Sequence, residues 1–113
     1  TARFIPAVEY LQANRVRTLL GREMQETMRD LDVYVAPSGH DPNGLLTNLT
    51  GHPAVVVPTG FDEEGSPTSV VFVAGVDDEA AALAVAKAFQ DATDYHTRQP
   101  PGFGVGEGRG AGD

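Results

Sequence analysis

Three histidines, His40, His52 and His96, are the side chains of this sequence best suited to binding a metal or moving a proton. No two of them have the spacing His-x-His or His-Glu-x-x-His, which would present two ring nitrogens to one ion. The sequence has no cysteine, which excludes thiolate zinc sites, iron–sulfur clusters, disulfides and cysteine nucleophiles. We therefore predict neither a metal site nor a cofactor.

The stretch Ser38-Gly39-His40-Asp41 contains the three residue types of a hydrolytic triad. Neighbouring side chains point in different directions, so these residues cannot line up as nucleophile, base and orienting acid. We interpret the stretch as part of a polar loop that covers residues 38–44. A small self-sufficient hydrolase that uses His40 or His52 stays open as a third alternative.

The charge balance limits the kinds of partner. Sixteen acidic residues against eight basic ones give a formal charge of −8, and no cluster of lysine and arginine suits a phosphate backbone. No apolar run approaches the roughly 18 residues of a membrane span. Pro6 and Glu9 interrupt any secretion signal at the start of the sequence. We expect a cytoplasmic protein that contacts neither nucleic acid nor membrane directly.

Two helices are expected to position these groups. From about Pro6 to Asp30, apolar residues recur with the helical rhythm and form one stripe that must be buried. The stripe consists of Val8, Leu11, Val16, Leu19, Leu20, Met24, Met28 and Leu31. A second helix is predicted over residues 80–92, after Asp77, Asp78 and Glu79, whose carboxylates suit a helix start. Its core-facing residues are expected to be Leu83, Val85, Ala86 and Phe89.

Three strands are predicted at residues 32–37, 54–57 and 68–74, the last two joined by a turn at residues 62–67. The continuous apolar run of residues 54–57 predicts a central strand that is covered on both faces and left at Pro58 and Gly60. Residues 45–50 are expected to form a helical turn that ends at Gly51. The predicted fold class is α/β, with helices packed on a small mixed β-sheet.

From Gln99 onward, glycine alternates with other residues, and such a sequence does not offset the entropy of ordering. We predict one domain over residues 1–98 and a disordered tail over residues 99–113.

The sequence from Asn48 to Phe61 is Asn-Leu-Thr-Gly-His-Pro-Ala-Val-Val-Val-Pro-Thr-Gly-Phe. It resembles the block Asn-x-x-Gly-x-Pro-Ala…Val-Pro-x-Gly in the C-terminal part of the amidase signature family, which includes the A subunit of aspartyl/glutamyl-tRNA amidotransferase. Residues 13–18, 32–37, 65–75 and 79–100 are similar to the family's flanking segments, in the same order. The resemblance runs from about Arg3 to Pro101.

The resemblance implies amide hydrolysis through an acyl-enzyme, in which a second serine and a lysine activate a serine nucleophile. This sequence has only three serines, Ser38, Ser66 and Ser69, none adjacent to another, and its single lysine, Lys87, falls in the last predicted helix. We therefore assign no catalytic residue. Asp41, Thr47, Asn48 and His52 lie near the sheet ends where the family's substrates bind, and we expect them to line part of the pocket.

The leading hypothesis is a C-terminal fragment of an amidase-like hydrolase that is inactive by itself because the catalytic half is absent. It would take part in amide C–N hydrolysis only when joined to that missing N-terminal half. The alternative is a non-enzymatic association domain, because an orphaned sheet and an amphipathic helix leave apolar surface exposed. Its partner would be the missing half or another copy of this chain.

Overall fold

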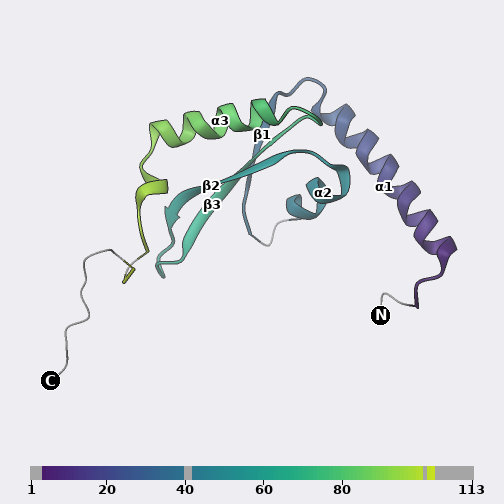
Figure 1. Cartoon of the computed structure of the whole chain (residues 1–113), viewed down its shortest axis with the longest axis horizontal. Helices are drawn as coiled ribbons and strands as arrows, with labels where there is room; N and C mark the ends of the chain where they lie inside the picture. Colours follow the sequence, from purple (N-terminus) through teal and green to yellow (C-terminus); the bar gives the residue numbers. More distant parts are fainter. Residues whose placement is uncertain (1–3, 40–41, 101, 104–113) are drawn as a thin grey trace.

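The computed structural model describes residues 4–39, 42–100 and 102–103. The elements follow the order α1 (Ala7–Met28), β1 (Val33–Pro37), α2 (Asn43–Thr50), β2 (Ala54–Phe61), β3 (Pro67–Ala74), α3 (Glu79–Ala92) and the short 3₁₀ helix η2 (Tyr95–Thr97). Figure 1 shows a body made of the sheet, α2 and α3, with α1 extending away from it. The α/β class is therefore confirmed.

The sheet is antiparallel throughout, in the order β1-β3-β2. The predictions of a mixed sheet and of β2 as its central strand were both wrong. A tight turn joins β2 to β3, in which the Asp62 carboxylate accepts the N–H groups of Glu64 and Ser66 at 3.0 and 2.8 Å. Because β3 inserts between β1 and β2, the two strands that run in the same direction never pair.

Strand β2 continues past Pro58, where the sequence predicted its exit. Pro58 pairs with Ser69, and the register then shifts between Pro58 and Gly60. Proline is tolerated in an edge strand because its missing N–H costs no ladder bond there. Gly60 has φ +119°, so the glycine allows an irregularity within the strand instead of ending it.

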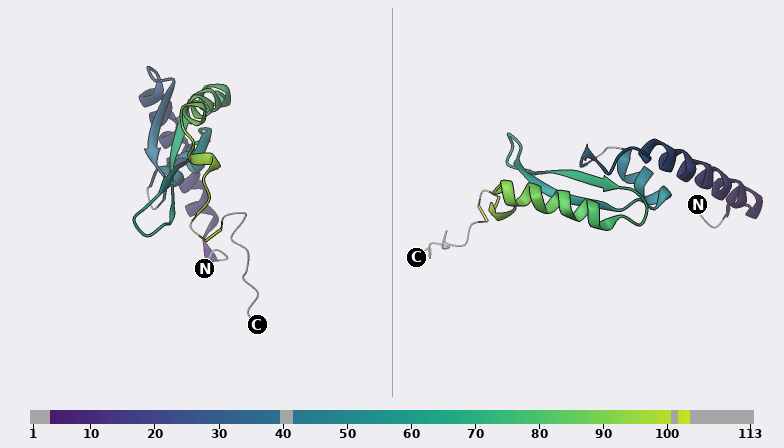
Figure 2. Two further views of the ribbon diagram at one scale, coloured as in Figure 1. Left: turned by 90° about the vertical axis from the view of Figure 1, so that its left-hand side faces the viewer. Right: turned by 90° about the horizontal axis from the view of Figure 1, so that it is seen from above.

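Helix α3 covers one face of the sheet (Figure 2). Val57, Phe72 and Ala86 form the core there, with Phe89 packed against them. The buried Ala82 and Ala86 and the partly buried Phe89 follow the spacing i, i+4, i+7, which defines the side of α3 that meets the sheet. Leu83 and Val85 lie to either side of that line and are exposed, so their predicted place in the core was wrong.

The other face of the sheet is only partly covered, by α2 (Figure 1). Val73, on the central strand, is fully buried, whereas Val56 on β2 is 59% exposed. The prediction that residues 54–57 are covered on both faces is therefore wrong among the described residues, because an eight-residue helix spans too little of the sheet.

Helix α1 confirms the predicted helix, but the eight apolar residues do not form the single buried stripe that was predicted. Met24 and Met28 are buried, whereas Val8, Leu11, Val16 and Leu19 are each more than half exposed. At about 100° per residue, those four lie on the side of the helix opposite the two methionines. The Cα radius of gyration is 19.7 Å, against about 13 Å for a compact domain of this length.

Most of the predicted tail, residues 101 and 104–113, lies outside the described residues, so the boundary at residue 98 stays a prediction. None of the helices in the described ranges combines the length and the apolar character that a membrane crossing requires.

Candidate functional site

A hollow of about 190 Å³ opens where β1 ends and α2 begins. It is lined by Pro37, Ser38, Gly39, Asn43, Gly44, Ala54, Val56 and Val71. Ala54, Val56 and Val71 form an apolar floor on the face of the sheet away from α3. Ser38 and Asn43 provide polar groups at the rim, so the hollow suits a small ligand with one apolar part and one polar part.

The rim is held by hydrogen bonds across the loop. The Tyr34 hydroxyl donates to Asn43 Oδ1 at 2.5 Å, which ties β1 to the first turn of α2. The Ser38 N–H donates to the Ser69 carbonyl at 3.2 Å. No ionisable side chain among the described residues lines this hollow. Ser38 therefore has no general base within the described lining.

Three of the four residues expected to line a pocket, Thr47, Asn48 and His52, are not in the lining of this hollow. Thr47 is buried, and its hydroxyl contacts the carbonyls of Asn43 and Gly44 at 3.1 and 3.2 Å, which occupies it within α2. Asn48 is exposed on the same helix. Asp41 lies outside the described residues, although residues on both sides of it in the sequence line the hollow. As pocket residues, these remain predictions.

His52 is buried between the end of α2 and the start of β2, with 5% of its surface exposed. Its Nδ1 lies 2.8 Å from the hydroxyl of Thr50. Its Nε2 is sealed from solvent and has no hydrogen-bond partner among the described residues. Burial lowers the pKa of His52, because the imidazolium would lose its hydration without gaining an acceptor.

A second hollow, of about 280 Å³, lies between α1 and α2. It is lined by Asn14, Arg17, Thr18, Gly21, Leu49 and Thr50. Nε of Arg17 donates to the Leu49 carbonyl at 2.7 Å, which satisfies one of the free carbonyls at the end of α2. This contact was not predicted from the sequence. The available signal was that Arg17 shares the side of α1 that carries Met24 and Met28.

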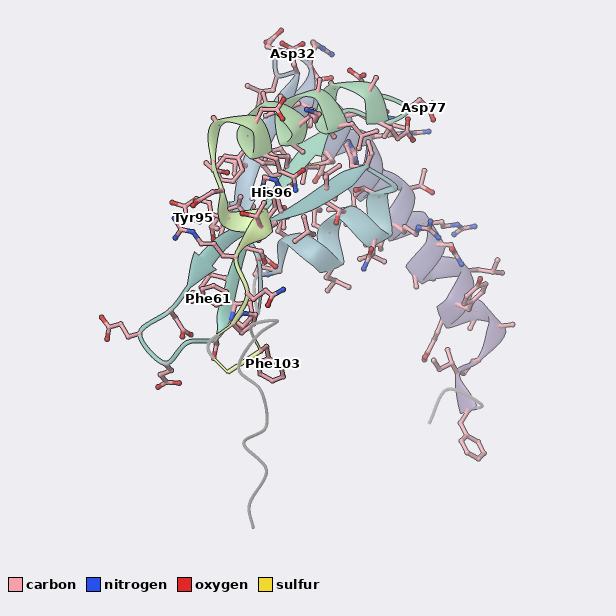
Figure 3. All side chains as sticks on the ribbon, turned by 60° about the vertical axis from the view of Figure 1, so that its left-hand side comes forward. Asp32, Phe61, Asp77, Tyr95, His96 and Phe103 are labelled. Carbon is pink, nitrogen blue, oxygen red and sulfur yellow. The ribbon has the colours of Figure 1, made fainter. Side chains whose placement is uncertain are left out.

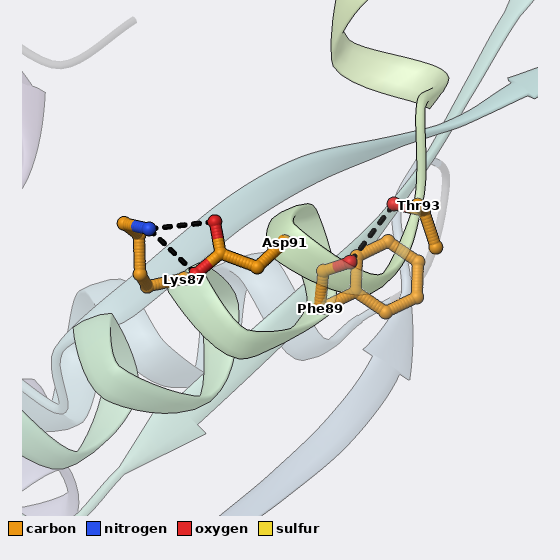
Figure 4. A network of polar contacts seen from close by, with 4 residues as sticks. All are labelled: Lys87, Phe89, Asp91 and Thr93. Atoms are coloured by element: carbon orange, nitrogen blue, oxygen red, sulfur yellow. Dashed lines mark hydrogen bonds and ion pairs between the residues drawn. The ribbon is translucent and has the colours of Figure 1, made fainter.

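The single lysine does not meet a serine. Lys87 Nζ lies 2.6 Å from both carboxylate oxygens of Asp91, one turn further along α3 (Figure 4). Both side chains are exposed. The contact is an ordinary helix-surface ion pair, with a stabilising contribution of about 0.3–0.5 kcal/mol.

The remaining acids and aromatic residues also occupy separate places. In Figure 3, Asp32 and Asp77 lie at one end of the body, whereas Phe61, Tyr95 and Phe103 lie towards the other. The Arg98 guanidinium beside Asp94 holds the pKa of that carboxyl below its usual value, mainly through a hydrogen bond. No group of three or more potential metal ligands occurs in the described ranges.

No family model matches the chain. It is 34% identical over 110 residues to the A subunit of the glutamyl-tRNA(Gln) amidotransferase of Halalkalibacterium halodurans, covering 80% of this chain and 22% of that protein. The corresponding protein of Gloeothece citriformis is 33% identical over 111 residues, with coverage of 81% and 23%. That of Nostoc sp. is 34% identical over 110 residues, with coverage of 80% and 23%.

These relatives are amidotransferase A subunits, the kind of protein that the sequence from Asn48 to Phe61 resembles. The chain spans less than a quarter of the length of the curated relatives it matches.

Proposed function

We propose that these residues form the C-terminal scaffold of an amidase-like protein, which acts on amide C–N bonds through groups supplied by other sequence. The observation that carries this proposal is the similarity to amidotransferase A subunits over 80% of the chain and 22% of the relative. The position at the C-terminal end comes from the resemblance of residues 48–61 to the family's C-terminal block.

The described chemistry fits a scaffold better than a complete active site. A serine nucleophile needs a base within hydrogen-bonding reach. The Lys87 amine is paired with Asp91 on the surface of α3, and the buried His52 ring contacts a threonine. Neither base has a serine partner among the described residues, which supports the proposal that the acyl-transfer groups come from other sequence.

The contribution of this chain to the proposed pocket is one wall. The hollow beside Ser38 and Asn43 has an apolar floor and a polar rim, and the loop between them contains Asp41. We propose that this loop and the first turn of α2 border the substrate, with Asp41 the candidate closest in sequence to the hollow. Thr47 and His52 would support that wall from within, and Asn48 from the surface of α2.

A second candidate function, an association domain, is favoured by exposed apolar residues on the outer side of α1. Val8, Leu11, Val16 and Leu19 form apolar surface that the described body does not cover. Its partner would be the catalytic part of an amidase or another copy of this chain, so both functions agree if the partner is the catalytic part. Sedimentation discriminates between them, because a chain that stays monomeric at high concentration speaks against self-association. The cytoplasmic location also stays a prediction.

A chimera tests the leading proposal. The matched 110-residue segment of the Halalkalibacterium halodurans protein is deleted in one variant and replaced by this chain in another. Ammonia release from glutamine is measured for both. We expect the deletion variant to be inactive and the chimera to recover activity. A chimera that folds like the intact relative but releases no ammonia contradicts the proposal, as does a fully active deletion variant.

A further inference from the structure

The hydrogen bonds around His52 determine where its proton lies. The Thr50 hydroxyl donates to the Leu46 carbonyl at 2.9 Å. A hydroxyl has one proton, so the same oxygen acts as the acceptor in its 2.8 Å contact with Nδ1 of His52. Nδ1 therefore carries the hydrogen, and a relay runs from the ring through Thr50 to Leu46.

The other ring nitrogen, Nε2, is then an acceptor without a donor among the described residues. In a neutral imidazole with hydrogen on Nδ1, Nε2 presents a lone pair. That atom is sealed from solvent and meets no donor among the described residues. A proton on Nε2 would place a positive charge in a buried position without an acceptor, which is strongly unfavourable. Burial lowers the pKa of His52 in the same direction.

The relay spans a sharp corner of the chain. Gly51 ends α2 with φ +80°, and its N–H donates to the Thr47 carbonyl at 2.8 Å. One residue after His52, the Pro53 carbonyl accepts the N–H of Ala74 at 3.2 Å, which joins the corner to the central strand. His52 therefore sits between a bond that closes α2 and a bond that anchors the start of β2.

We infer that His52 is a positioning residue, locked in the neutral Nδ1–H form by Thr50, which fixes the corner between α2 and β2. This corner determines the orientation of α2 relative to the sheet, and hence the position of the wall of the hollow at Asn43. The inference assigns the histidine no proton transfer. It does not rest on the proposed amidase function, since it depends only on contacts within the chain.

The first test is spectroscopic. Imidazole ¹⁵N shifts of the labelled full chain, recorded near neutral pH, distinguish the two neutral tautomers from the imidazolium. We expect His52 as the Nδ1–H tautomer. A ring with hydrogen on Nε2, or on both nitrogens, overturns the inference in the unmodified protein.

Variants of Thr50 and His52 provide the second test. Thr50→Val removes the acceptor and should release the tautomer lock, whereas Thr50→Ser keeps the hydroxyl and should retain it. Asn at position 52 places an N–H near the position of Nδ1, so His52→Asn should preserve the corner and His52→Leu should not.

The readout is hydrogen exchange at the amides of Gly51 and Ala74. We expect exchange about tenfold faster in Thr50→Val and His52→Leu, as for the loss of one hydrogen bond, and near wild-type exchange in Thr50→Ser and His52→Asn. Equal protection in His52→Leu and His52→Asn contradicts the positioning role. If Thr50→Val does not fold, the conservative pair and the wild-type spectrum still decide the question.

Discussion

At the scale of single residues, Gly60 occupies a backbone position that side chains rarely adopt. Its φ is +119°, and an added Cβ would lie 3.5 Å from two atoms of the Tyr95 ring. The space is therefore sufficient and the backbone is the obstacle. We predict that Gly60→Ala lowers the free energy of unfolding by about 1–3 kcal/mol, measured by urea denaturation.

Gly21 offers the matched control for that substitution. It lies within α1, and an added Cβ would meet nothing within 4 Å. Gly21→Ala should raise the stability by about 0.5–1 kcal/mol, because alanine favours a helix interior. Equal changes in the free energy of unfolding for the two substitutions would contradict the positive φ at Gly60.

His52 makes stability depend on pH on the acid side of neutrality. Its pKa in the folded chain lies below the ordinary value of 6.5. Below pH 6.5 the unfolded chain therefore binds a proton that the folded chain does not, and the free energy of unfolding falls as the pH falls. Above that value the group contributes no slope. His52→Asn should remove the slope, measured by urea titrations between neutral and mildly acid pH.

Two comparisons control for other causes of this pH dependence. His96→Asn removes an exposed histidine and controls for the loss of the residue type. The pKa of Asp94 is lowered from its ordinary value of 3.8, chiefly by Arg98. Asp94 therefore stabilises the fold above pH 3.8, and this stabilisation is lost as the pH falls further. Its window is thus separate. A His52→Asn protein with the full wild-type slope would assign the slope to other groups.

Local backbone signals were readable from the sequence at several residues. Gly51 was predicted to end a helical turn, and it does so with φ +80°. The unpartnered Nε2 of His52 and the Arg17 bond to α2 were not readable, because each depends on segments that only the fold brings together.

At the scale of elements, the start of α3 depends on one carboxylate. Asp78 Oδ1 accepts the N–H of Ala81 at 3.2 Å, as expected for a residue that caps the first turn. We predict that Asp78→Ala lowers the stability by about 1 kcal/mol, measured by thermal or urea denaturation. Asp78→Asn keeps the acceptor oxygen and should cost far less, and a large loss for that variant would show that charge dominates.

Helix α1 should respond differently on its two sides. Met28 is buried against the body, so Met28→Ala should lower the stability by about 2–5 kcal/mol. Leu19 is exposed on the other side, so Leu19→Ala should change it by no more than about 0.5 kcal/mol. Urea denaturation of both variants checks the pair, and a strong effect at Leu19 would show that the stripe is already covered in the free chain.

The elements themselves could largely be predicted, because apolar periodicity depends on local sequence. Which elements pack against one another could not be predicted in the same way. The apolar run at residues 54–57 has the pattern of a central strand, yet β2 lies at the edge, because β1 pairs with β3 and a local apolar pattern does not specify that long-range pairing. Likewise, the pattern of α1 shows that its stripe favours burial but not what covers it.

At the scale of the whole molecule, the described chain is elongated, with principal extents of 67 × 40 × 22 Å (Figure 2). Its exposed apolar residues include four on the outer side of α1, Val56 on the open face of the sheet, and others on α2 and α3. The class of the fold followed from the sequence, whereas this exposure did not, because it depends on tertiary contacts that periodicity does not specify.

The central claim is that these residues support an acyl-transfer pocket without supplying the reacting groups. Ammonia release by the purified chain, offered glutamine and simple aliphatic and aromatic amides, tests it most directly. We predict no release above the buffer control. Release that grows with the concentration of the chain and disappears in Ser38→Ala would contradict the claim.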